Sequence, residues 1–428
     1  MQPPRDWRIT LLFLLCLTFF LERGAYRALR YETAGDFSTV YAAARCWLDG
    51  SNPYESFNLK AELAEAGAPL SVQRDQDVNP SVYLPSAFPW MALIACLPWW
   101  TANALWVLFS LVVVGWSLLA LTRATSLGRE GKFLAVSAAL LFSPTYVGIY
   151  DGNPGVIVIG LLCVLTCEAL GRDRRSAGIL LGITLCFKPQ LAAGALLILA
   201  IRKRRNTLLT GSLVFGLSLG LGVLVVSHFG RDSGWWMSEQ RNLAVSIQPG
   251  GQSDPAPSSN VAWQLLNAQT ISAYVWKSRS AYDAAVWTVS AALCVIFWLR
   301  RRTARKVETW RMICFLSLVP LLLTYHRYYD AQLLLLLIPL LAQLWETRMR
   351  GPLVAFGAML LILAFPVQSV FARKMGEAAT TASLAQFMLL RNQPLALLGI
   401  VVMLAWWPWG LERPGNPFAN RSAAHGEH

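Results

Sequence analysis

Charged residues are scarce in this sequence. They make up 14% of its 428 residues, whereas soluble domains carry about 25%. Hydrophobic residues make up 55%, and the 18 tryptophans are typical of chains that meet a membrane–water interface. The composition therefore excludes an ordinary soluble domain and indicates an all-α polytopic membrane protein.

Several common motifs are also missing. The sequence has no Walker or dinucleotide glycine loop and no HExxH zinc motif. Of the eight cysteines, only Cys46 lies outside the apolar segments, so there is neither a disulfide framework nor a zinc spacing. Asp75 and Asp77 form a short DxD, but it falls in an outer loop, where nucleotide sugars are not normally available. We therefore assign no metal and no cofactor.

The net charge of +13 could suggest a nucleic-acid partner, but its distribution argues against one. Lys and Arg gather in short clusters between apolar segments, as they do in cytoplasmic loops that face anionic lipid. We expect membrane lipids as partners and no nucleic acid. The clusters lie at 123–132, 172–175, 202–205, 300–306 and 348–350.

Apolar segments predict about twelve transmembrane helices, some of them short or kinked. The segment 85–98 is either re-entrant or another span. Treating it as re-entrant places every basic cluster on the side of the N-terminus, so both termini are cytoplasmic. We expect one transmembrane domain over 1–411 and a disordered cytoplasmic tail over 412–428. The predicted spans are 7–21, 102–122, 133–150, 154–170, 177–188, 189–201, 207–228, 282–299, 311–325, 331–345, 352–370 and 392–410.

In this topology two long loops, 22–84 and 229–281, lie on the outer side of the cytoplasmic membrane. Apolar residues at helical spacing predict an amphipathic helix over 37–49, and a second short helix is expected over 59–66. Both would be interfacial helices at the membrane surface. The centre of loop 229–281 is rich in Gly, Pro and Ser, which suits either a mobile lid or an ordinary connector.

Polar residues of the first loop are the first candidates for chemistry. Asp36 directly precedes the predicted helix, so it is either a helix N-cap or a catalytic base. Tyr41 and Arg45 stand four residues apart on that helix. They would contact a sugar or phosphate, or else serve as an interfacial aromatic and a snorkelling arginine.

Further candidates lie at outer ends of later spans. Lys188 has apolar sequence on both sides, and an ionisable residue there is costly enough to suggest a functional role, although a lysine beside a proline kink can also snorkel. His326 and Arg327 lie in a tight outer turn, where they could hold a phosphate or belong to an aromatic-belt turn with an Arg–Asp pair. Asp151 and Asn153 are explained by turn chemistry alone.

These segments together resemble a known family. Residues 35–37, 40–44 and 48–54 resemble the opening motif of the polyprenol-phosphate-mannose-dependent mannosyltransferases of glycosyltransferase family 87. Residues 83–89, 152–154 and 187–190 resemble its later motifs in the same order. Residues 259–262, which contain Asn260, are similar to its N-x-S element, and 325–328, which contain His326, to its outer turn.

The resemblance implies a GT-C glycosyltransferase fold, metal-independent catalysis and a polyprenyl-phosphate sugar as donor. It makes Asp36 the general base and places His326 near the donor phosphate, with Lys188 as a further electrostatic contact. We therefore expect an inverting membrane transferase that moves a hexose, in the first instance mannose, to a hydroxyl of a lipid or glycan acceptor on the extracytoplasmic face. Arg327 would join the donor phosphate site, and Tyr41, Arg45 and Asn260 would contact substrate.

Two alternatives remain open on the sequence. One is a secondary transporter with its site near Lys188 and His326, since broken helices and an intramembrane cation are typical of transporters. The other is a lipid-linked sugar transferase with a different sugar or acceptor. The large asymmetric outer loop and the absence of a visible inverted repeat favour the enzyme.

Overall fold

A computed structural model describes residues 7–30, 35–76, 80–229, 234–259, 261–300, 306–375 and 384–406. Within these ranges all regular secondary structure is helical, and the β contacts are limited to an isolated bridge between Leu265 and Arg327. This confirms the predicted all-α class. Asn260, Asp77 and the predicted tail over 412–428 lie outside the described residues.

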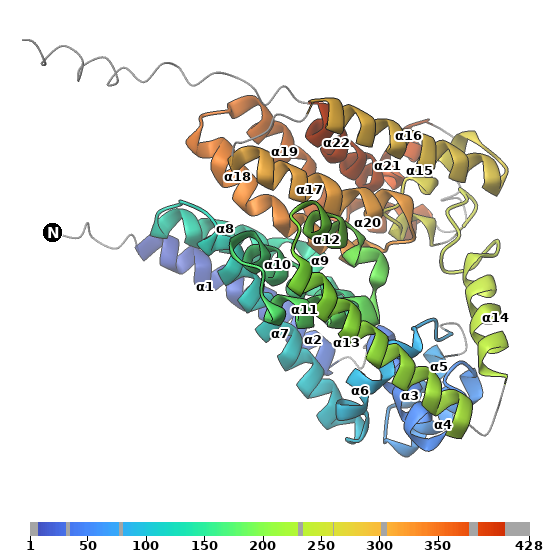
Figure 1. The fold of residues 1–428 in the computed structure, drawn as a ribbon. Coiled ribbons are helices and arrows are strands. Elements are labelled where there is room, and N and C mark those ends of the chain that lie inside the picture. Colours follow the sequence, from blue (N-terminus) through green and yellow to red (C-terminus); the bar gives the residue numbers. More distant parts are fainter. Residues whose placement is uncertain are drawn as a thin grey trace, which may run out of the picture.

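Figure 1 shows the helices in chain order. The first half contains α1 (Trp7–Leu21), η1 (Glu22–Tyr26), α2 (Arg27–Arg30), α3 (Gly35–Asp49), α4 (Ser56–Glu65), α5 (Leu70–Asp75), η2 (Pro85–Ala87), α6 (Phe88–Ala95), α7 (Trp99–Arg123), α8 (Arg129–Leu141), α9 (Ser143–Tyr150), α10 (Pro154–Gly171), α11 (Arg175–Phe187) and α12 (Pro189–Ile201). The second half contains α13 (Arg205–Leu224), η3 (Val225–Phe229), α14 (Trp235–Ile247), η4 (Ala262–Gln264), α15 (Gln269–Val275), α16 (Arg279–Arg300), α17 (Lys306–Leu323), η5 (Tyr328–Leu336), α18 (Leu337–Glu346), α19 (Arg350–Ala364), α20 (Val367–Met375), α21 (Leu384–Leu390) and α22 (Asn392–Trp406).

Several of these helices are long enough to span a membrane. Seven in the described part of the chain are long and apolar enough to cross a bilayer, or up to nine if each of two bent pairs, α8–α9 and α21–α22, counts as one span. Four shorter apolar helices lie at 85–95, 175–187, 189–201 and 309–323. Each of the twelve predicted segments contains helix within the residues that the structure describes, and the exact number of spans stays a prediction.

Two boundaries differ from the sequence-based expectation. The first helix does not stop at Leu21 but continues through a π-helical turn to Arg30. The segment that begins at Pro85 forms one short helix to Ala95, about 16 Å long at 1.5 Å per residue. That length is roughly half of a bilayer's apolar core, so this helix is too short to cross alone.

Helices α3, α4, α5 and α6 gather at one end of the long helices α7 and α13 (Figure 1). There α3 packs against α4 and α6, and the Trp47 indole donates a hydrogen bond to the Gly222 carbonyl of α13 at 3.0 Å. Most of α3 is buried, including Phe37, Val40 and Ala44. The helix that the sequence predicts over 37–49 is therefore enclosed by protein on most of its sides.

Three local features position the polar residues near the start of α3. The side chain of Asn153 caps α10 by accepting a hydrogen bond from the Gly155 N–H, and Pro154 suits the first helical position. Lys188 has a non-helical backbone (φ −144°, ψ 76°), which separates α11 from α12. The nine-residue 3₁₀ helix η5, longer than such helices usually are, then carries Asp330 into the same region.

Candidate active site

Asp36 lies in the first turn of α3, where its backbone N–H donates to the Asp151 carbonyl at 3.2 Å. One carboxylate oxygen, Oδ2, accepts a hydrogen bond from the Asn153 amide at 2.5 Å. The other oxygen, Oδ1, has no hydrogen-bond partner among the residues that the structure describes. Asp36 is also partly exposed.

The turn that receives Asp36 is itself fixed from two sides. Gly152 has φ +64°, a conformation that suits glycine, and its carbonyl accepts a hydrogen bond from the Trp106 indole at 2.9 Å. Asn153 is buried, and its Oδ1 accepts hydrogen bonds from the Gly155 N–H at 2.6 Å and from Lys188 Nζ at 3.0 Å. Asn153 therefore joins Asp36 to Lys188.

The network continues through a buried ion pair. Lys188 Nζ lies 2.9 Å from Asp330 Oδ1, with side-chain exposures of 12% and 5%. The other oxygen of Asp330 lies 3.0 Å from His326 Nδ1, and His326 Nε2 lies 2.9 Å from the Thr324 hydroxyl. Hydrogen bonds thus connect Asp36 to the fully buried His326 through Asn153, Lys188 and Asp330.

Gly155 makes this junction possible. A Cβ at this position would lie 2.5 Å from Asn153 Oδ1, 2.7 Å from Asp330 Oδ1 and 2.8 Å from Lys188 Nζ. Any side chain would therefore push these three groups apart. The glycine at the start of α10 is required by close packing rather than by an unusual backbone conformation.

A polar cavity of about 610 Å³ adjoins the network. Arg327 and Asp151 line it, together with residues of η1, α2, α9, η4 and α20. The Arg327 side chain donates hydrogen bonds to the Tyr325 hydroxyl at 2.5 Å and to the Gln252 side-chain oxygen at 3.1 Å. The lining residues are Arg23, Arg27, Tyr146, Val147, Tyr150, Asp151, Trp263, Gln264, Arg327, Tyr328, Tyr329, Pro366, Gln368 and Ser369.

The pKa shifts of Asp151 and Arg327 show which charges share this region. Burial raises the pKa of Asp151 to about 8, and the neighbouring Asp36 carboxylate adds to the rise. Burial opposes the charge of Arg327, but Tyr329, Tyr325 and Asp36 together raise its pKa. At neutral pH the cavity wall therefore presents the Arg327 cation beside a largely neutral Asp151.

The structure brings together only some of the residues that the sequence selects. Asp36, Lys188, His326 and Arg327 share one region. Tyr41 instead donates to the Leu97 carbonyl at 2.6 Å and is fully buried, away from this network. Asp36, Lys188 and His326 are held mainly by Asn153, Asp151 and Asp330.

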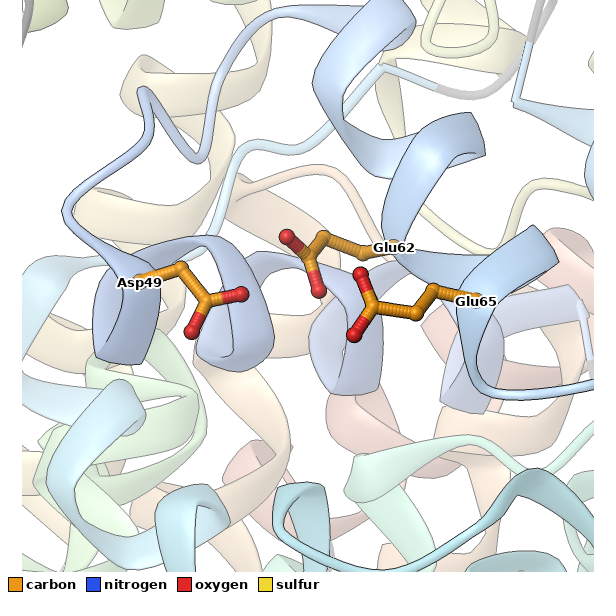
Figure 2. Close-up of side chains that lie close together, drawn as sticks. All are labelled: Asp49, Glu62 and Glu65. Atoms are coloured by element: carbon orange, nitrogen blue, oxygen red, sulfur yellow. The ribbon is translucent and has the colours of Figure 1, made fainter.

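Arg45 belongs to a separate cluster on α3 and α4. Its guanidinium lies 3.0 Å from Glu62 and 3.6 Å from Glu65 and donates to the Ala95 carbonyl at 3.0 Å. Figure 2 shows the carboxyl groups of Asp49, Glu62 and Glu65 directed toward one another, close enough for a cation. Since Arg45 already supplies positive charge to two of these carboxylates, we assign no ion to this cluster.

Asn153, Gly155 and Asp330 are the residues of the network that sequence reasoning did not select. Asn153 follows Gly152 and precedes a proline, so turn propensity explained it fully. Asp330 lies four residues after His326, a helical spacing that does indicate a shared face, although its pairing with Lys188 joins residues 142 positions apart. Nothing in the sequence marks Gly155, because its role follows from the side chains that pack against it in the folded protein.

Comparison with known proteins gives one match. The model of glycosyltransferase family 87 matches residues 82–325, which is more than half of the chain. This stretch contains Asn153, Gly155 and Lys188; Asp36 precedes it, and His326 follows it directly. No curated protein and no solved structure matches the chain. The family match, the all-helical fold and the apolar spans together show that the chain belongs to glycosyltransferase family 87 and is a polytopic membrane glycosyltransferase of GT-C-like fold.

Proposed function

We propose that the protein transfers mannose from a polyprenyl-phosphate donor to a hydroxyl of a lipid or glycan acceptor on the extracytoplasmic face of the cytoplasmic membrane. The family assignment supports sugar transfer. The observation that carries the proposal is that the network from Asp36 to His326, which contains the Lys188 cation, lies next to a cavity lined by the cationic Arg327, Arg23 and Arg27. In a glycosyl transfer a carboxylate can accept the proton of the acceptor hydroxyl, and cations can stabilise the leaving phosphate.

Asp36 is the general base of the proposed reaction. Asn153 holds Oδ2, which leaves Oδ1 to accept the proton of the acceptor hydroxyl. The acceptor oxygen forms a bond to the anomeric carbon while the bond from that carbon to the phosphate oxygen breaks. The lipid phosphate leaves with the bonding electrons, and attack from the opposite side inverts the anomeric configuration.

The leaving phosphate gains negative charge, so the reaction needs fixed positive charge opposite Asp36. Arg327 faces the cavity, and its planar guanidinium suits a phosphate. Lys188 and His326 do not line the cavity, and each is bonded to Asp330. We assign Arg327 to direct phosphate contact, and Lys188 and His326 to charge stabilisation from the second layer. In this proposal Arg327 and Lys188 supply the positive charge without a metal.

The position of the site along the helices supports the outer face. Asn153 lies at the start of α10, and the basic residues 172–175 follow its end. An 18-residue helix is about 27 Å long, which is close to the thickness of a bilayer core. If this basic cluster is cytoplasmic, as the positive-inside rule favours, Asp36 and the cavity open on the opposite side.

The test is transfer by the purified protein in lipid nanodiscs. Polyprenyl-phosphate donors that carry labelled mannose, glucose, galactose or arabinose are supplied with a panel of lipid acceptors. We expect a labelled glycolipid from the mannose donor. Transfer from another donor alone would replace mannose with that sugar. Ion-driven uptake of a solute in proteoliposomes, with no transfer from any donor, would favour the transporter.

A further inference from the structure

The polar cavity of about 610 Å³ is lined by two kinds of polar side chain. One kind is cationic, and the proposed reaction uses a member of it, Arg327, to contact the donor phosphate. The other kind comes from η4 and α20 and is polar but uncharged. Neither the family match nor the proposed reaction gives this second group a role. We call it the uncharged wall, and it consists of Trp263, Gln264 and Gln368.

The polar groups of the uncharged wall have no partners in the described part of the chain. Gln368 is 1% exposed, and its Oε1 is buried without a hydrogen-bond partner among those residues. The Trp263 indole N–H and the Gln264 amide likewise make no hydrogen bond to them. The neighbouring Ser369 hydroxyl, by contrast, donates to the Pro366 carbonyl at 2.6 Å. A buried amide oxygen without a partner is destabilising, so its position in a cavity wall indicates a ligand.

The chemistry of the uncharged wall suits a sugar better than a phosphate. A sugar hydroxyl both donates and accepts hydrogen bonds, and a glutamine amide offers two N–H donors and an acceptor oxygen. An ionised phosphate only accepts, so the Gln368 oxygen would repel it. The Trp263 indole adds one N–H donor and an apolar ring. An aromatic surface with a few placed polar groups is typical of sites for small molecules.

The uncharged wall lies beside Arg327. Leu265, which directly follows Gln264, forms the isolated antiparallel bridge with Arg327, and the Leu266 N–H donates to the His326 carbonyl at 2.9 Å. Since bridged residues are about 5 Å apart and consecutive Cα atoms 3.8 Å apart, the Cα atoms of Gln264 and Arg327 lie within about 10 Å of each other. Helix α20, which carries Gln368, packs against η4. A sugar joined to a phosphate at Arg327 would therefore reach this wall.

We propose that the uncharged wall binds the sugar of the donor and that Gln368 selects this sugar through a hydrogen bond to one of its hydroxyls. The inference rests on the proposed function, because it takes the donor to be a sugar phosphate held at Arg327, but it holds for sugars other than mannose. A site that pairs a buried polar group with one hydroxyl rejects a sugar that lacks it. Gln368 lies beyond residues 82–325, so the family match does not supply this role.

The test replaces Gln368 with leucine, which keeps a side chain of similar length but removes the amide. The matched control is Gln343→Leu. Gln343 lies in the apolar helix α18, also has a buried Oε1 without a partner among the described residues, and does not line the cavity. Gln264→Leu changes the same wall from η4 and serves if Gln368→Leu does not fold, because Gln264 is partly exposed and should tolerate the change.

The first readout is kcat/KM for polyprenyl-phosphate mannose and for its monodeoxy analogues, or for the same series built on whichever sugar the nanodisc assay identifies. The wild type should lose about 100-fold on the analogue that lacks the hydroxyl bound by Gln368, because the amide is then left unpaired. Gln368→Leu should lose about 100-fold on the complete sugar and nothing further on that analogue. Gln343→Leu should keep the wild-type values throughout.

The second readout is retention of the sugar-bearing donor and of sugar-free polyprenyl phosphate in native mass spectrometry, which needs no turnover. Gln368→Leu should retain the sugar-free lipid as the wild type does and lose the sugar-bearing one. This pattern without transfer from any donor would reject the proposed function but keep the sugar site. The inference is overturned if Gln368→Leu matches Gln343→Leu in both readouts, or if it changes selectivity only among deoxy acceptors, which would give the wall to the acceptor.

Discussion

Replacing Asp330 with asparagine tests the buried ion pair that connects the site. Lys188 Nζ lies 2.9 Å from Asp330 Oδ1, and both side chains are largely buried. At an effective dielectric constant near 20, two unit charges at that distance attract by about 6 kcal/mol. Desolvation of the two ions offsets much of this, so the pair itself adds little net stability. Removal of the carboxylate charge alone, however, leaves the Lys188 ammonium buried and unpaired.

We expect Asp330→Asn to lower the free energy of unfolding by about 3 kcal/mol, the lower end of the range for breaking a buried pair, because asparagine can still accept one hydrogen bond. Lys188→Met on the Asp330→Asn background removes the unpaired charge. The double variant should therefore be more stable than the sum of the single changes predicts, by about 1–3 kcal/mol.

The assay is equilibrium unfolding of the purified proteins in mixed micelles. Glu65→Gln is the control, since Glu65 is 72% exposed and lies 3.6 Å from Arg45. Its effect should stay within about 0.5 kcal/mol. The reasoning is refuted if Asp330→Asn is as stable as Glu65→Gln, or if the effects of the two network substitutions simply add.

Three other substitutions examine the site and its surroundings. Gly155→Ala should reduce the transfer rate by about 100-fold in the nanodisc assay, because its Cβ displaces the groups joined to Asp36, whereas Gly115→Ala, with open space around it, should not. Burial raises the pKa of Asp151 to about 8, so above that pH a second negative charge should form beside Asp36. The transfer rate of the wild type should therefore decline above pH 8. A pH–rate profile of Asp151→Asn should lack this decline. Because the folded state holds this proton more tightly than the unfolded state, the stability of the wild type should also fall as pH rises from about 4 to 8, and Asp151→Asn should remove that contribution in unfolding measured across the same range. Tyr41→Phe should cost about 1 kcal/mol of stability through loss of the hydrogen bond to Leu97 and leave KM unchanged; a higher KM at unchanged stability would instead support the substrate contact that the sequence suggested.

Helix positions were largely predictable because long apolar runs leave few alternatives in a membrane. Each of the twelve predicted segments contains helix within the described residues, and Gly50, with φ +70°, directly follows the end of α3. The continuation of the first helix to Arg30 was not predictable from hydropathy, because Glu22 and Arg23 interrupt the apolar run. Glu22 forms salt bridges with both Arg23 and Arg27, which makes a helical conformation acceptable there.

The candidate site was predictable only in part, since charge in an apolar context marks a residue but not its partner. Lys188 and His326 stood out for this reason, and both belong to the network. Their common partner Asp330 was ordinary in sequence. Tyr41 and Arg45 were selected from their helical spacing after Asp36. That spacing could not reveal that α4 and α6 cover the face of α3 on which they lie.

The most direct measurement of the central claim is turnover by Asp36→Asn. Asparagine has nearly the same size and can still accept the hydrogen bond from Asn153, but it cannot take a proton from the acceptor. We predict that kcat falls by about 10²–10⁴-fold while retention of polyprenyl phosphate and protein yield stay at wild-type levels. Turnover at the wild-type rate would contradict the account and leave Asp36 as a residue that only fastens α3 to the turn before α10.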